Sequence, residues 1–161
     1  MHAFDSNAFI HNIKTERVLG PTGIFVIETK QYTGGPLLVP PDPNAEWRQQ
    51  WGRYSYPRLN ALVQNARHVQ AVRTLLDFVP PQHIYSLVVF TGTAPLPPGH
   101  PVNVMPLPAL IGHIRCYTHK VLTTQDLHLC LGRLEWMRRR ISRQTDVEHL
   151  ANLNRRFGTI D

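Results

Sequence analysis

The feature that most constrains the fold of this chain is a short apolar run between a turn and a charged pair. The run extends from Ile24 to Ile27 and follows the turn Gly20-Pro21-Thr22-Gly23. Pro fixes φ at one turn position, and Gly permits either sign of φ. β-branched and aromatic residues in a run of this length are typical of a central, buried strand. Together with a strand expected at residues 14–19, the run predicts a β-hairpin.

The predicted central strand ends in a Glu-x-Lys pair. Side chains two positions apart on a strand point to the same face, so Glu28 and Lys30 are expected to stand together where the core meets the sheet edge. A carboxylate suits a hard cation such as Mg²⁺, and an ammonium group can stabilise charge on a phosphate. Metal-assisted phosphodiester hydrolysis needs this pair plus at least one more carboxylate. The alternative is a solvated strand edge with a salt bridge, which is the commoner setting for so short a motif.

The remaining patterns alternate predicted strands and helices. They are strands at 37–39, 84–91 and 102–105, a loop or short strand at 47–56, and helices at 108–115, 124–141 and 145–153. The last helix is expected to open at Thr145-Asp146-Val147-Glu148, which is a capping-box pattern. The helix at 124–141 has an apolar side formed by Leu127, Leu131, Leu134 and Met137.

The clearest predicted helix opens at Pro57 and stops before Pro80-Pro81. Apolar residues recur at three-and-four spacing along it and define a buried stripe: Leu59, Leu62, Val63, Ala66, Val69, Val72 and Leu76. Beside that stripe, Asn60, Gln64 and His68 form a polar one. Amide side chains can bind a phosphate, a base edge or a water molecule. An ordinary solvent-facing stripe would look the same.

The order of these elements predicts an α/β fold, or an α+β mixed sheet flanked by helices. The 161 residues suit a single domain over 1–161, with a basic helical part from about residue 120. A hydrophobic fraction of 42% is enough for a real core. No apolar run approaches the roughly 18 residues of a membrane span, so no membrane segment is expected. The two cysteines, Cys116 and Cys130, have the spacing of neither a disulfide framework nor a metal site, which favours a cytoplasmic location.

Three ordered motifs resemble the nuclease-related domain (NERD) family. They are the turn and strand from Gly20 to Gly34, the helix segment from Asn60 to Val69 with Trp51 before it, and the strand from Leu87 to Gly92. The similarity runs from about Thr15 to about Ile114. The resemblance implies a PD-(D/E)xK restriction-endonuclease-like core and metal-dependent cleavage or processing of DNA. It further implies Mg²⁺ or Mn²⁺ as cofactor, Glu28 as metal ligand, Lys30 as catalytic lysine and Gln64 as the helix amide near the site.

The chain departs from the family pattern before the turn. The family has an Asp on the first strand, and its spacing places Thr15 there. Glu16 is the adjacent candidate for the metal carboxylate, and it would need a bulge or register shift to reach the face of Glu28. Asp5 is a more remote candidate. The family's first helix is also expected to be missing, because about a dozen unpatterned residues precede the first strand.

A formal net charge of +6 favours a polyanionic partner, either nucleic acid or an anionic membrane surface. Asn60 and His68 of the polar stripe and Arg138, Arg139 and Arg140 of the basic helical part are the candidate contacts to DNA. A solvated helix face is the equal alternative for the arginines. The aromatic residues of the 47–56 segment, interleaved with Arg48 and Arg53, would stack on bases or pack as a loop on the sheet, and we favour packing.

The first functional hypothesis is a metal-dependent nuclease-like domain acting on DNA. The second is a catalytically inactive DNA-binding or protein-interaction module on the same fold. The third is an accessory protein in which a second copy or a partner chain completes the fold. The sequence places the first two nearly level.

Overall fold

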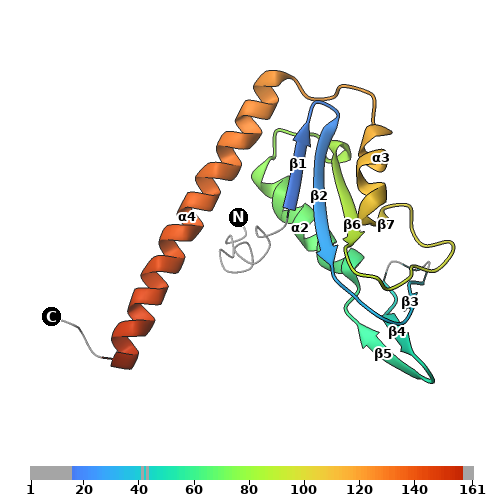
Figure 1. Cartoon of the computed structure of the whole chain (residues 1–161). Coiled ribbons are helices and arrows are strands. Elements are labelled where there is room, and N and C mark those ends of the chain that lie inside the picture. The colour runs from blue at the N-terminus through green and yellow to red at the C-terminus, as the bar shows by residue number, and fades with distance from the viewer. Residues whose placement is uncertain (1–15, 41, 43, 158–161) are drawn as a thin grey trace.

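The structure, a computed structural model, describes residues 16–40, 42 and 44–157, with side chains described to residue 140 (Figure 1). Two sheets are formed within these residues, with strand orders β1-β2-β6-β7 and β3-β4-β5. The strands are β1 (Glu16–Gly20), β2 (Gly23–Lys30), β3 (Leu37–Leu38), β4 (Trp47–Trp51), β5 (Tyr54–Arg58), β6 (Ile84–Phe90) and β7 (Val104–Pro106). The α-helices are α2 (Ala61–Leu75), α3 (Leu110–Arg115) and α4 (Thr124–Phe157), and 3₁₀ turns occupy Pro81–His83 and Leu107–Ala109.

The sheet that contains β2 is mixed, as predicted. β1 and β2 form the expected antiparallel hairpin, while β6 runs parallel to β2 and β7 runs parallel to β6. β2 is buried from Gly23 to Glu28, which is the expectation for a strand with neighbours on both sides and helices on both faces. The structure therefore confirms the α/β class and the central position of β2.

Alternate residues of β2 face two different layers. Ile24 and Val26 pack in one apolar cluster with α2 and the first turns of α4. Phe25 and Ile27 pack in a second cluster with α3 on the opposite face. Because side chains alternate along a strand, Glu28 and Lys30 share the α2 face with Ile24 and Val26.

The second sheet lies beyond the carboxyl ends of β2 and β6 (Figure 1). The predicted loop or short strand at 47–56 is a hairpin of β4 and β5, anchored by Trp47, which is fully buried and stacks on Phe90 with ring centroids 5.9 Å apart. The predicted helix start at Pro57 is wrong, because Pro57 belongs to the edge strand β5. A proline fits there since an edge strand leaves N–H positions unpaired.

Helix α2 begins after Asn60, whose side-chain oxygen accepts hydrogen bonds from the backbone N–H groups of Leu62 and Val63. This is the geometry of an N-cap, which satisfies donors that the first turn leaves free. Leu59 precedes the cap and is exposed, so it does not belong to the buried stripe predicted for this helix.

Helix α4 is continuous from Thr124 to Phe157, so the separate helix predicted at 145–153 is wrong. The sequence contains neither Gly nor Pro between Arg133 and Phe157 to interrupt it. The capping box lies instead at the start of α4, where Thr123 and Asp126 exchange hydrogen bonds. Leu131 is exposed. Both cysteines are of a residue type expected in or near the core, but only Cys130 is buried there, and Cys116 is exposed.

Within the described ranges, no helix combines the length and apolar content that crossing a membrane requires. The expected absence of a first helix concerns residues 1–15, and that prediction lies outside the described residues, as do Asp5 and Thr15.

Candidate functional site

The end of β2 brings a carboxylate and an ammonium group into contact. Glu28 Oε1 lies 2.7 Å from Lys30 Nζ, and the Glu28 residue is only 8% exposed. Both side chains project from the same face of β2, toward α2, as the strand spacing predicts. A carboxylate this deeply buried needs compensating partners, because removing a charge from water is costly unless it is paired.

Helix α2 supplies two more polar side chains to the same place. Lys30 Nζ donates a hydrogen bond of 2.7 Å to Gln64 Oε1, and His68 Nε2 lies 3.2 Å from Glu28 Oε2. Gln64 and His68 are four residues apart, so they lie one turn apart on one face of the helix. We call Glu28, Lys30, Gln64 and His68 the Glu28 cluster.

The three side chains predicted for catalysis thus meet in space. His68 is buried against Glu28, so the alternative of an ordinary solvent-facing stripe does not hold for this residue. Its role as a DNA contact stays a prediction. Each carboxylate oxygen of Glu28 therefore has its own partner, one from the strand and one from the helix. This arrangement fixes the carboxylate and adds a second positive charge whenever His68 is protonated.

A cleft of about 670 Å³ opens beside the cluster. It is lined by Asn44, Ala45, Glu46, Arg58, Leu59, Asn60, Val63, Gln64, Arg67 and His68. Gln64 and His68 connect this cleft to Glu28 and Lys30. Arg58 and Arg67 place two permanent positive charges on its wall, so an anionic ligand is favoured there over a cationic one.

Asn60 lines the cleft, but its amide is used within the fold. Its oxygen caps α2, and its Nδ2 donates a 2.8 Å hydrogen bond to the Ala45 carbonyl. These contacts join the start of α2 to the segment before β4. The role of Asn60 as a DNA contact stays a prediction. Its hydrogen bonds show that it holds the wall of the cleft together.

Glu16, the predicted second carboxylate, does not lie on the Glu28 face in this structure. The hairpin register is regular and pairs Glu16 with Ile27 and Arg17 with Val26. Paired residues of an antiparallel hairpin share a face, so Arg17 stands on the Glu28 side and Glu16 on the α3 side. No bulge shifts this register among the described residues of β1, and Glu16 is exposed.

The donors of the Glu28 cluster fit a hard divalent cation in kind, because Glu28 offers a carboxylate and Gln64 an amide oxygen. They are few: in the described part of the chain, no group of three or more His, Cys, Asp or Glu side chains is placed to hold a metal ion. Mg²⁺ often uses only one or two carboxylates and completes its shell with water and substrate phosphate oxygens. A metal ion at this cluster would therefore depend on oxygens from the bound substrate.

Asn65, next to Gln64, has a structural role that the sequence analysis missed. It is fully buried, and its Nδ2 lies 2.9 Å from each of the Val26 carbonyl, the Leu87 carbonyl and Ser86 Oγ. One amide thus joins α2 to β2 and β6 immediately below the cluster. The only sequence signal for this helix-to-sheet contact is that two polar residues, Gln64 and Asn65, are adjacent on a helix that packs on a sheet.

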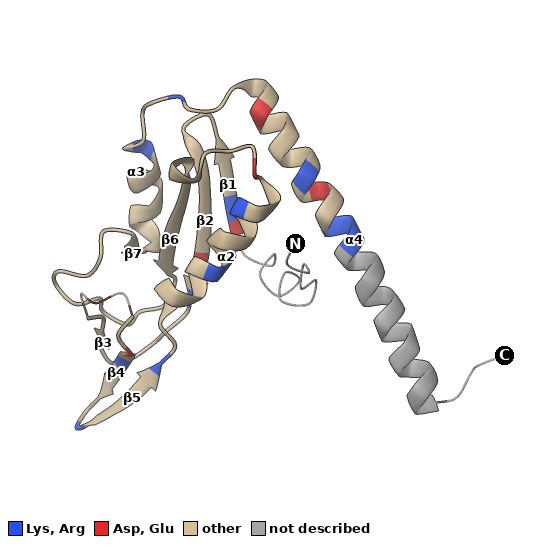
Figure 2. Cartoon of the chain, turned by 180° about the vertical axis from the view of Figure 1, so that it is seen from behind, with Lys and Arg blue, Asp and Glu red and all other residues tan. Residues whose placement is uncertain are grey.

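The arginines predicted to contact DNA from α4 are not part of the cluster. Arg138 pairs with Glu135 at 2.9 Å, and the Arg140 guanidinium lies 4.8 Å from the ring centroid of Trp136. Figure 2 shows acidic and basic segments mixed along the described side chains of α4. The basic character predicted for this helix is therefore partly neutralised within the helix itself.

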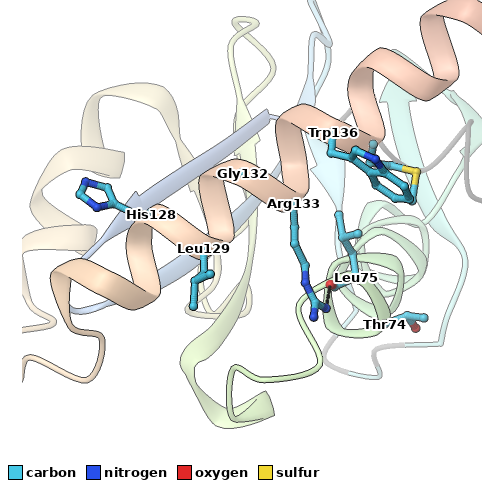
Figure 3. A pocket seen from close by; sticks show the side chains of 8 residues that line it. Thr74, Leu75, His128, Leu129, Gly132, Arg133 and Trp136 are labelled. Carbon is cyan, nitrogen blue, oxygen red and sulfur yellow. Dashed lines mark hydrogen bonds between the residues drawn. The ribbon is translucent and has the colours of Figure 1, made fainter.

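Helix α4 meets α2 at the end remote from the cluster. Arg133 Nη1 donates to the Leu75 carbonyl at 2.9 Å, about 16 Å along α2 from Gln64 at the helical rise of 1.5 Å per residue. A groove of about 630 Å³ lies at this contact and is lined by Thr74, Leu75, His128, Leu129, Gly132, Arg133, Trp136 and Met137 (Figure 3). This groove is apolar, and it shares no lining residue with the cleft beside Glu28.

The fold and the cluster together define an α/β domain with a Glu-x-Lys pair at the end of its central strand. A family model described as the nuclease-related domain matches residues 17–91, which include all four residues of the Glu28 cluster. Residues 17–91 are therefore similar to the nuclease-related domain family, and this similarity favours a nuclease-related function. Comparison with curated proteins and with solved structures found no significant match.

Proposed function

We propose that the Glu28 cluster binds DNA and hydrolyses its phosphodiester bonds with the help of Mg²⁺ or Mn²⁺. The observation that carries the proposal is the contact of Glu28 with both Lys30 and His68 on the wall of an arginine-bearing cleft. A lone Glu-x-Lys pair on a solvated edge would have neither the helix partners nor the burial. The match to the nuclease-related domain supports the same chemistry.

Each cluster residue has a definite task in this proposal. Glu28 is the carboxylate that would hold the cation, and Lys30 stabilises negative charge on the scissile phosphate. Gln64 holds the Lys30 ammonium in place through the 2.7 Å hydrogen bond, and His68 fixes the second oxygen of Glu28. When bound, the cation supplies a water of lowered pKa and further neutralises the phosphate.

The partner in the proposal is DNA. Arg58 and Arg67 of the cleft would contact phosphates near the cluster, and Arg138, Arg139 and Arg140 would contact them farther away. Phosphate contacts from arginine release counterions, so binding is expected to weaken steeply with salt.

A second candidate function is DNA binding without cleavage. The observation that favours it is that both carboxylate oxygens of Glu28 already contact protein side chains, one the Lys30 ammonium and the other the His68 imidazole. Such a neutralised carboxylate can hold a strand to a helix without binding a metal ion. In that case the cleft and its arginines would still bind DNA.

The test is cleavage of plasmid DNA, as duplex and in heat-denatured single-stranded form, in Mg²⁺ or Mn²⁺ by the wild-type chain and by the double variant Glu28→Gln, Lys30→Met. We expect the variant to lose at least about 10²- to 10³-fold in rate, the range for removing one preorganised charge-stabilising group. The matched control is Asp77→Asn, Arg133→Met, which removes a carboxylate–cation pair of 2.6 Å at the far end of α2.

Cleavage by the wild type and the control, but not by the double variant, would support the proposal. Equal cleavage by all three would point to a contaminating nuclease and sink it. Salt-sensitive DNA binding by a wild-type chain that never cleaves would establish the second candidate instead.

A further inference from the structure

The hairpin of β4 and β5 carries exposed aromatic rings on a single face. Trp51 lies directly opposite Tyr54, and Tyr56 lies opposite Gln49. Residues paired in this way share a face, and positions two apart on a strand share it too. Trp51, Tyr54 and Tyr56 are all exposed. Loop packing was the favoured interpretation of these residues, and the structure corrects it for these three rings.

The exposure of these rings belongs to a well-anchored hairpin. Trp47 begins the same face of β4 and is buried against Phe90. The buried Gln49 follows, and its side-chain amide nitrogen Nε2 donates hydrogen bonds to the carbonyls of Thr33 and Gly35. This face of β4 therefore runs from the buried Trp47 to the exposed Trp51, and its inner residues are anchored in the fold.

Trp51 is supported on one side by backbone. A Cβ added at Gly34, whose φ is +91°, would overlap the indole ring of Trp51, so the ring lies directly on this glycine. The residue is nevertheless 47% exposed. A large ring supported from below and open above is a preorganised stacking surface, and it loses little conformational freedom on binding.

Positive charge accompanies the rings. The Arg53 guanidinium lies 5.1 Å from the Tyr54 ring centroid and donates to the Tyr54 hydroxyl at 3.0 Å. Arg58 follows Tyr56 on the same face of β5. Aromatic rings interleaved with arginine are the combination that binds single-stranded nucleic acid, because bases stack on rings while phosphates meet cations.

The aromatic face is continuous with the cleft at the cluster. Arg58 lines a cavity of about 590 Å³ with Trp51, Tyr56 and Pro57, and it also lines the larger cleft with Gln64 and His68. Positions two residues apart on a strand lie roughly 6.6 Å apart along the backbone, close to twice the 3.4 Å rise between stacked bases. One strand of nucleic acid can therefore follow the hairpin face toward Glu28.

We propose that Trp51, Tyr54 and Tyr56 form a platform that stacks unpaired bases of single-stranded DNA and leads that strand to the Glu28 cluster. This rests on the proposed function in that it names the substrate class of the same site. Duplex DNA cannot stack its bases on the platform, because the faces of paired bases are already stacked on their neighbours in the duplex.

The test is fluorescence anisotropy with a labelled oligo(dT) of about twelve nucleotides, within the range of single-strand site sizes, and with a hairpin duplex, both in EDTA. Trp51→Ala and Tyr56→Ala are each expected to raise the dissociation constant for oligo(dT) about tenfold, in line with the loss of one stacked base. Duplex binding should change less than about twofold, and Trp51→Phe should restore most of the affinity because it restores a ring. The matched control is Trp136→Ala, which removes a tryptophan 53% exposed on α4.

Wild-type affinity in both platform variants would overturn the inference, as would an equal loss in Trp136→Ala or no binding of oligo(dT) by the wild type. A loss with Trp51→Ala that Trp51→Phe rescues would support it even if no variant cleaves DNA. EDTA makes this measurement independent of hydrolysis, so a failed cleavage assay and a failed platform are told apart.

Discussion

The two sheets present their polar and aromatic side chains in opposite environments. At the end of β2, Glu28 is buried and contacted on both oxygens. On β4 and β5, Trp51 and Tyr56 stand in solvent on a hairpin whose base is buried. Charged groups act most strongly where water is excluded, whereas ring faces bind only if they are open. The difference agrees with the two proposals, chemistry at the Glu28 cluster and base stacking on the hairpin.

The comparison also concerns what holds each region in place. Side chains hold the cluster: Lys30 reaches Gln64, and Asn65 joins the helix to both central strands. The hairpin is anchored by Trp47 and Gln49 and has close backbone approaches as well, with Gly34 and Gly35 packed directly against β4. Substitutions should therefore damage one region without the other.

The largest expected effect follows from Gly35→Ala. A Cβ at this position would overlap the carbonyl oxygen of Gln50 in β4, which is backbone and cannot turn aside. Overpacking of this kind costs about 1–3 kcal/mol or more, so we expect a loss of about 3 kcal/mol in the free energy of unfolding. Urea unfolding measures it, and Gly20→Ala is the control, because a Cβ there meets nothing within 4 Å.

Binding by the same variant would sharpen the comparison. Gly35→Ala should lose affinity for oligo(dT), because the hairpin moves, while the packing of Glu28 against α2 persists. A Gly35→Ala chain as stable as Gly20→Ala, with unchanged binding, would show that the hairpin is not held by backbone contact.

A smaller effect is expected at two adjacent positions of α2. Asn65→Ala removes the donor that serves the Val26 and Leu87 carbonyls, and an unsatisfied buried group costs about 1–3 kcal/mol. Gln64→Ala removes one partner from the part-buried Lys30, so it should cost about 1 kcal/mol or less in stability. It should lower cleavage if the proposed function holds. Equal stability losses at the two positions would contradict this division of roles.

The smallest effect concerns pH and a region remote from both sheets. Hydrogen bonds from the Thr123 hydroxyl and backbone N–H hold the pKa of Asp126 below its ordinary value of 3.8. The folded carboxyl therefore takes up its proton at lower pH than the unfolded one. Its stabilising contribution is present above about pH 4 and is lost as pH falls through the lowered pKa.

Thermal unfolding at several pH values below 5 provides the measurement. Asp126→Asn should flatten a small part of the acid-side decline in the melting temperature without altering oligo(dT) binding at neutral pH. A change in that binding would mean that the start of α4 and the hairpin are coupled, which would break the independence of the regions.

The strand that ends at Lys30 is predictable from sequence because its signals are local. A turn of Gly and Pro precedes it, and a spacing of two places Glu28 and Lys30 on one face whatever the rest of the fold does. The contact of Glu28 with His68 is different. The spacing of Gln64 and His68 shows that they share a helix face, but the face that meets β2 depends on how α2 packs.

The wrong boundaries have equally specific causes. Pro57 fits the first turn of a helix as well as an edge strand, and only the pairing of β4 with β5 decides between them. Thr145 and Thr123 both precede an acidic residue by three positions, so the sequence contains two capping boxes for one helix start. Glu16 is placed by a hairpin register that a single sequence leaves open between regular and bulged forms.

The parallel pairing of β2 with β6 has a consequence for the order of folding. Ile24 lies opposite Ile84, so the residues of the whole second sheet and of α2 separate these two paired strands in the sequence. Such long-range pairing requires closure of a large loop and is slow compared with hairpin formation. During synthesis, Glu28 leaves the ribosome long before the strand that encloses it. The nascent chain therefore carries an open carboxylate at this position, and its buried setting arises only when β6 docks.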